Sequence, residues 1–216
     1  MFQRLAKLLF PPKCVLCRSL LPPGRTELCA GCAAKAPVCE KPTKSIPFVE
    51  KWTALWYYND IIRRSFLRYK FYNARSYAVP YGKLLAARLA REYPDGVPLL
   101  TWAPISKKRK RKRGYDQTEL IARVVARELG VPLVPVLTRV LDSGPQSSLR
   151  DAAARRANVL GAYRVTDRDA IAGKTVLLLD DIITTGVTVS ECAKTLLTAG
   201  AAGVHCAALA TPTLKK

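Results

Sequence analysis

Two adjacent acids and a threonine-rich loop, within VLLLDDIITTGVT at residues 176–188, carry the residue types most suited to binding chemistry. The apolar run 176–179 has the length and branching of a strand buried in a parallel sheet. Asp180 and Asp181 then lie at its carboxyl end, the edge at which open α/β sheets bind their ligands. The segment therefore predicts a ligand site built on a strand end.

The loop after these acids has the composition of an anion-binding turn. Small residues let the backbone close round a phosphate, and N–H groups at the start of the following helix can hold it together with the hydroxyls of Thr184, Thr185 and Thr188. Because Asp180 and Asp181 would repel a phosphate, we expect them to accept hydrogen bonds from vicinal ribose hydroxyls, directly or across a Mg²⁺ ion. The plainer alternative is a capped helix without a ligand, in which one acid or threonine serves only as the N-cap.

Four cysteines near the N-terminus form two C-x-x-C pairs separated by eleven residues, namely Cys14, Cys17, Cys29 and Cys32. Such spacing can bring four thiolates round one tetrahedral ion, for which Zn²⁺ is the usual choice. Four protein ligands leave no open position, so we predict a structural metal that stabilises a short segment. Disulfides, a redox pair or an iron–sulfur cluster are the alternatives. The repeated spacing and the lack of a secretory signal make disulfides and a redox pair weaker alternatives, whereas an iron–sulfur cluster is chemically possible and would show colour.

The chain carries a formal net charge of +20 and one run of seven basic residues: Lys107, Lys108, Arg109, Lys110, Arg111, Lys112 and Arg113. Like charges repel, so the run is predicted to be a solvated loop whose partner is a polyanion such as single-stranded nucleic acid. Aromatic rings nearby could stack on unpaired bases: Tyr57, Tyr58, Phe66, Tyr69, Phe71, Tyr72 and Tyr77. The plainer interpretation places these rings in the core and leaves the basic run with nonspecific attraction to anions.

Apolar runs alternate with amphipathic stretches along most of the chain. We expect strands at 52–58, 99–104, 131–137, 162–165, 176–179 and 204–210, and helices at 61–69, 80–91, 117–129 and from the 184–188 loop to about 199. This alternation predicts an α/β fold with a mostly parallel sheet and helices on both faces. A proline-bearing stretch near residue 45 suggests a boundary between an N-terminal segment (1–45) and the larger domain (46–216).

The stretch 142–159 is polar and is not patterned as a strand. It is predicted to be a lid, in which Gln146, Arg150, Arg156 and Asn158 close over a bound diphosphate. A plain surface helix over 149–158 is the alternative.

Length and hydropathy bear on the size of the core and on the compartment in which we expect the protein. With 216 residues and 49% hydrophobic composition, it can bury one α/β core plus a small appendage. No apolar stretch approaches the roughly 18 residues of a membrane span. The first ten residues lack the features of a signal peptide and suggest a short helix, so we expect a cytoplasmic protein.

The order of these motifs resembles the ComF family of bacteria over nearly the whole chain. It comprises the four-cysteine segment, LRYKFYNARSYA, KKRKRKRGYDQTELIA, PQSSLRDAAARRANVLGAYRV, VLLLDDIITTGVT and AGAAGVHCAALA. The resemblance implies a type I phosphoribosyltransferase-like fold behind a zinc ribbon. It also implies a role in natural transformation, on the cytoplasmic side, where a partner helicase acts as single-stranded DNA enters.

The same resemblance implies site residues. Asp180 and Asp181 match the ribose-contacting acids of proteins that bind phosphoribosyl pyrophosphate with Mg²⁺, and Thr184, Thr185, Gly186 and Thr188 match the cradle for the 5′-phosphate. Further site candidates lie in the recurring pieces: Lys70, Arg113, Gly114, Gln117, Gln146, Arg156 and Asn158. The chain departs from the family pattern at Ala103, usually Val, and at Asp116, often Asn.

These motifs support two hypotheses about function. In the first, the protein handles DNA and binds a ribose phosphate. In the second, it is an active phosphoribosyltransferase that releases pyrophosphate, for which the sequence shows no recognisable acceptor pocket.

Overall fold

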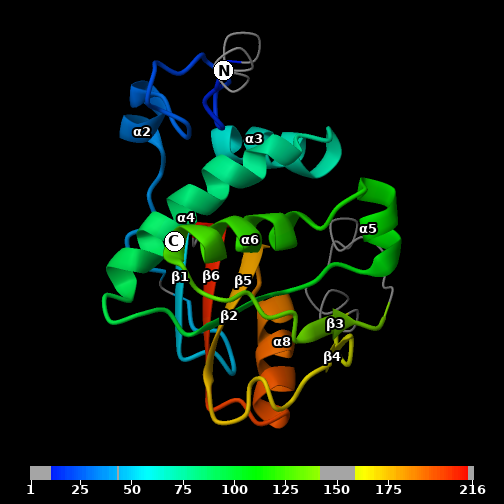
Figure 1. Ribbon diagram of the computed structural model, residues 1–216. Coiled ribbons are helices and arrows are strands. Elements are labelled where there is room, and N and C mark those ends of the chain that lie inside the picture. Colours follow the sequence, from blue (N-terminus) through cyan, green and yellow to red (C-terminus); the bar gives the residue numbers. More distant parts are fainter. Residues whose placement is uncertain (1–10, 43, 142–158, 214–216) are drawn as a thin grey trace.

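The centre of the fold is a four-stranded parallel sheet, seen in a computed structural model that describes residues 11–42, 44–141 and 159–213 (Figure 1). Its order is β1-β6-β5-β2, with β1 at Lys51–Tyr57, β6 at Gly203–Thr211, β5 at Thr175–Ile182 and β2 at Leu99–Trp102. Each neighbouring pair is parallel. The two longest strands, β5 and β6, occupy the centre, as their apolar composition predicts.

Helices cover both faces of this sheet. They are α3 (Asp60–Phe71), α4 (Ala78–Glu92), α6 (Gln117–Leu129) and α8 (Val187–Thr198), with a 3₁₀ turn, η1, at Arg75–Tyr77. Alternate residues of β5 join different cores: Leu177 and Leu179 pack with α3, α4 and α6, whereas Val176 and Leu178 pack with α8. The predicted fold class, with the parallel sheet and its two helical layers, is therefore confirmed.

One predicted strand, 131–137, is wrong. Pro132 and Pro135 have no N–H to donate to a ladder, so this stretch cannot pair continuously. Towards β2 it makes an isolated bridge between Leu133 and Leu100 and a bond from the Val134 N–H to the Leu100 carbonyl at 2.9 Å. The chain then forms a separate antiparallel pair from β3 (Leu137–Arg139) and β4 (Tyr163–Val165).

The basic run is also a correction, because it forms the helix α5 (Lys107–Arg113) and not a loop. The Ser106 hydroxyl caps its start by accepting the Arg109 N–H at 3.3 Å. Gly114 ends it with a left-handed backbone, φ 77°. An ion pair of 2.8 Å between Lys110 and Glu119 of α6 offsets part of the charge repulsion. Capping and the ion pair to α6 therefore outweigh the repulsion among the basic residues, and the run is helical.

The four-cysteine segment, which includes α2 (Ala30–Lys35), packs against α3 (Figure 1). The Ser65 hydroxyl donates to the Val15 carbonyl, and the Arg68 guanidinium donates to the Leu16 carbonyl at 2.5 Å. The predicted N-terminal helix and the predicted lid at 142–158 lie outside the described residues.

Candidate functional site

A cavity of about 710 Å³ lies at the carboxyl ends of β2 and β5, where the acids and the threonine loop were predicted to meet. Many of the predicted site residues line it: Lys70, Arg109, Lys112, Arg113, Gln117, Asp180, Asp181, Thr184, Thr185, Gly186 and Thr188. Gly114 does not line the cavity but ends α5, where its carbonyl accepts a bond from Arg75 at 3.2 Å. Gln146, Arg156 and Asn158 lie outside the described residues.

The two acids differ in their surroundings. Asp181 is only 6% exposed, and its carboxylate lies 2.8 Å from the Lys70 ammonium and accepts the Gln117 amide at 3.0 Å. Burial by itself raises the pKa of Asp181, but Lys70 and Gln117 hold that pKa below its usual range. Burial and the adjacent charge of Asp181 raise the pKa of Asp180. The strand end thus presents one firmly ionised carboxylate beside one that takes up a proton readily.

The threonine loop is shaped by Gly186, the residue that precedes α8. Its φ of 80° is a left-handed conformation, and a Cβ there would lie 3.2 Å from the Ile46 side chain. The first turn of a helix leaves N–H groups without an intrahelical partner, and those of α8 begin directly after Gly186. The loop therefore brings a helix N-terminus and threonine hydroxyls to the cavity wall, as an anion site requires.

Sequence reasoning missed Lys44, which lies behind this loop. Its ammonium donates to the Thr184 carbonyl at 3.3 Å and to the Thr185 carbonyl. The Lys44 carbonyl in turn accepts the Trp52 indole N–H at 2.7 Å. Burial lowers the pKa of Lys44. Because some 140 residues separate the partners, no local pattern could have revealed the contact.

Arg139 and Tyr163, from β3 and β4, also line the cavity and were missed. Both side chains are buried, and the Arg139 guanidinium donates to the Tyr163 hydroxyl at 3.0 Å. The only signal in the sequence is a single arginine that follows an apolar run. These two residues place a polar wall on the β3–β4 side of the cavity.

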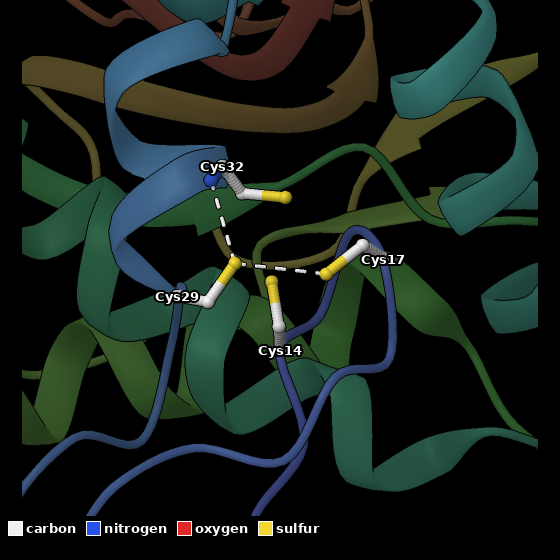
Figure 2. Close-up of side chains that lie close together, drawn as sticks. All are labelled: Cys14, Cys17, Cys29 and Cys32. Carbon is white, nitrogen blue, oxygen red and sulfur yellow. Dashed lines mark hydrogen bonds between the residues drawn. The ribbon is translucent and has the colours of Figure 1, made fainter.

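The second candidate site is the four-cysteine cluster (Figure 2). The sulfur atoms of Cys14, Cys17, Cys29 and Cys32 all lie within 4.8 Å of one another, and those of Cys17 and Cys29 are 3.6 Å apart. Zinc–sulfur bonds of about 2.3 Å in a tetrahedron place sulfur atoms roughly 3.8 Å apart, so the donor set fits a zinc ion. All seven cysteines of the chain lie in the described segments, and each has a free thiol.

Hydrogen bonds to Cys17 and Cys29 favour the thiolates that a metal needs, whereas burial raises the pKa of Cys32. Ser19 Oγ lies 2.6 Å from Cys17 Sγ and lowers the pKa of Cys17 to about 6. Cys29 caps the start of α2 and accepts the Cys32 N–H at 3.4 Å, which lowers the pKa of Cys29. The Ser19 hydroxyl and the backbone N–H of Cys32 thus help to orient two of the four ligand sulfur atoms.

Comparison with known proteins agrees with this geometry. Residues 117–215 match the phosphoribosyl transferase domain family, so the fold and the cavity define a protein with a type I phosphoribosyltransferase domain. The chain is 26% identical to Competence protein ComFC of Bacillus subtilis (strain 168) over 149 residues, which cover 69% of this chain and 59% of that protein. It is 27% identical to Competence protein F of Haemophilus influenzae over 210 residues, which cover 85% of this chain and 90% of that protein.

A third relative, DNA utilization protein YhgH of Salmonella typhi, is 29% identical over 191 residues, which cover 86% of this chain and 78% of that protein. An N-terminal four-cysteine cluster thus precedes a phosphoribosyl transferase domain, and the chain is similar over most of its length to proteins named for competence and for DNA utilization. Among the described residues, no helix is long and apolar enough to cross a membrane.

Proposed function

We propose that the protein binds a ribose phosphate of the phosphoribosyl pyrophosphate type, with Mg²⁺, and assists the handling of incoming single-stranded DNA in the cytoplasm during natural transformation. The observation that carries the first part is the cavity, in which an acid pair, a threonine loop at a helix N-terminus and three cations of α5 face one another. Relatives named as competence or DNA utilization proteins support the second part. The helicase partner is proposed only because the resemblance to the ComF family implies it.

Each group in the cavity has a matching part of such a ligand. The loop from Thr184 to Thr188 holds the 5′-phosphate through N–H groups and hydroxyls, and Asp180 and Asp181 accept hydrogen bonds from the ribose hydroxyls. Arg109, Lys112 and Arg113 face the diphosphate, for which guanidinium groups offer forked contacts. Bound Mg²⁺, which prefers carboxylate and phosphate oxygens, would neutralise part of the diphosphate charge.

An active phosphoribosyltransferase is the second candidate. The complete acid pair favours it, because groups that hold the ribose can also stabilise the positive charge that develops there as pyrophosphate leaves. Arg139 and Tyr163 offer a polar wall against which an acceptor could bind. Release of pyrophosphate from phosphoribosyl pyrophosphate, measured with and without candidate acceptor bases, separates this function from binding alone.

The acid pair provides the test of the ribose-phosphate site. Asp180→Asn/Asp181→Asn is expected to weaken binding of phosphoribosyl pyrophosphate with Mg²⁺ at least about 100-fold, because each carboxylate accepts charge-assisted or metal-mediated contacts. Titration calorimetry measures the loss. The matched control is Asp95→Asn/Asp169→Asn, which removes the same charge from exposed positions and leaves affinity unchanged. If both variants bind equally well, or if the native protein does not bind, the proposed ligand is wrong.

The contact from Lys44 gives a second prediction. Lys44→Met is expected to weaken the same ligand about tenfold, since two loop carbonyls lose a charged donor and the loop no longer holds one orientation. Lys44→Arg keeps the charge and should restore most of the affinity. Lys174→Met is the matched control, because it removes a lysine contact of 3.0 Å to the Ala170 carbonyl far from the cavity. Unchanged affinity in Lys44→Met would show that the loop holds its shape without this residue.

A further inference from the structure

Helix α5 presents its cations on two faces. Arg109, Lys112 and Arg113 recur at the spacing of one helix face and line the cavity. Lys107, Lys108 and Arg111 share the opposite face, are exposed, and do not line the cavity. Lys110 pairs with Glu119. The basic run is therefore divided between the cavity and the outer surface.

Two exposed aromatic residues stand at the end of α3, and the first of them contacts α5. Phe71 is 61% exposed and Tyr72 is 76% exposed, at the end of α3. The Arg113 guanidinium lies 5.2 Å from the centre of the Phe71 ring, which places Phe71 beside α5, and Tyr72 is the next residue along the chain. Phe66 and Tyr69, by contrast, are buried in the core, so the predicted set of stacking rings is reduced to the residues on the surface. Exposed rings beside a row of cations are the usual elements of a surface for single-stranded nucleic acid.

We propose that single-stranded DNA binds across the mouth of the cavity, with its phosphates on the outer face of α5 and its bases stacked on Phe71 and Tyr72. This inference rests on the proposed function, because it assigns the DNA and the ribose phosphate to neighbouring surfaces. The cavity itself does not suit DNA, because deoxyribose lacks the vicinal hydroxyls that Asp180 and Asp181 can bind. A duplex is a poor fit, since its bases are already stacked on one another.

The two ligands share Phe71 and Arg113, which line the cavity and also border the outer surface. Both ligands are polyanions that contact the same two residues, so their charges lie close together and repel one another. Each ligand therefore weakens the binding of the other, and linkage requires the same factor in both directions. The ribose phosphate thus acts to release DNA from the surface.

Three variants of the full-length protein test this surface, with anisotropy of a labelled oligo(dT) strand for DNA and calorimetry for phosphoribosyl pyrophosphate with Mg²⁺. Lys107→Gln/Lys108→Gln/Arg111→Gln is expected to weaken oligo(dT) at least tenfold and to reduce the salt slope by about two, at roughly 0.7 per phosphate contact. Its affinity for the small ligand stays within about twofold. Phe71→Ala/Tyr72→Ala should weaken oligo(dT) about tenfold or more without changing the slope. Arg109→Gln/Lys112→Gln should mainly weaken the small ligand.

Lys35→Gln/Arg91→Gln/Lys174→Gln is the matched control, because it removes the same charge from exposed positions elsewhere. The proposed surface is wrong if this control lowers the affinity for oligo(dT) as much as the α5 variant does. It is also wrong if duplex DNA binds as tightly as oligo(dT) and its affinity is unchanged in Phe71→Ala/Tyr72→Ala. Saturating small ligand should weaken oligo(dT) binding by the native protein, and independent binding would overturn the shared mouth. A native protein that binds DNA through these residues but does not bind phosphoribosyl pyrophosphate would instead contradict the proposed function and uphold the surface.

Discussion

Purified protein is expected to contain about one equivalent of zinc, and Cys14→Ser/Cys32→Ser is expected to contain none. Both cysteines are buried, Cys14 completely and Cys32 with 7% exposure, so serine leaves two ligands and two polar groups in an apolar setting. Zinc binding contributes on the order of 10 kcal/mol to the folding of small zinc modules. Its loss should therefore unfold the segment 11–39 and expose the surface of α3 beneath it.

Metal analysis measures the first effect, and amide hydrogen exchange measures the second. Exchange should become fast in 11–39. It should stay slow in β5 and β6, because these two strands are hydrogen-bonded on both sides at the centre of the sheet. The control is Cys206→Ala, which changes a fully buried cysteine of the other core and should keep its zinc. Reduced native protein with less than about half an equivalent of metal, or with iron in its place, would contradict a zinc site.

The fold was predictable wherever hydrophobic pattern decided the structure. The apolar runs at β5 and β6 fixed two strands, and buried parallel strands need helices on both faces. The hydrophobic pattern gave wrong predictions where single residues or distant partners determine the secondary structure. At 131–137 the composition favours a strand, but two prolines remove the N–H groups that the ladder needs. In α5, Ser106, Gly114 and the distant Glu119 outweigh the repulsion among neighbouring cations.

The candidate site likewise has a part that the sequence predicts and a part that only the folded chain brings together. The acids and the threonine loop are contiguous in the sequence, so one strand end and one turn place them together. Lys70 and Gln117 lie on different helices, and the resemblance to the ComF family selected them, because no spacing rule connects either residue to Asp181. Lys44 approaches the loop from the stretch after the cysteine cluster, a contact that only the folded chain creates.

Lys70→Met is expected to destabilise the native protein by about 3 kcal/mol at neutral pH, measured in Mg²⁺-free buffer without ligand. Lys70 and Asp181 form an ion pair of 2.8 Å whose side chains are 19% and 9% exposed, so water cannot replace the lost partner. The variant keeps Asp181 buried next to Asp180, with the Gln117 amide still donating to its carboxylate. The free energy of unfolding, from urea titration, reports the change.

The pH dependence of the free energy of unfolding identifies why Lys70→Met is less stable. In the native protein the pKa of Asp181 is below its usual range, so its contribution is present above its unfolded-state pKa, near about 4, and is lost as the pH falls further. Without Lys70 the pKa values of both carboxyl groups are raised, and the folded variant binds protons at a higher pH than the unfolded chain does. Its stability relative to the native protein should therefore recover between about pH 7 and pH 5.

The control for this prediction is Lys83→Met, which breaks a longer and more exposed ion pair, 3.7 Å from Glu27. Such a pair contributes about 0–1 kcal/mol, so the control should change little at either pH. Equal destabilisation of Lys70→Met at pH 7 and pH 5 would assign the effect to the packing of the lysine stem. A loss that recovers in acid assigns it to the charge that keeps Asp181 ionised, which is the state in which Asp181 can bind a ribose hydroxyl or a metal ion.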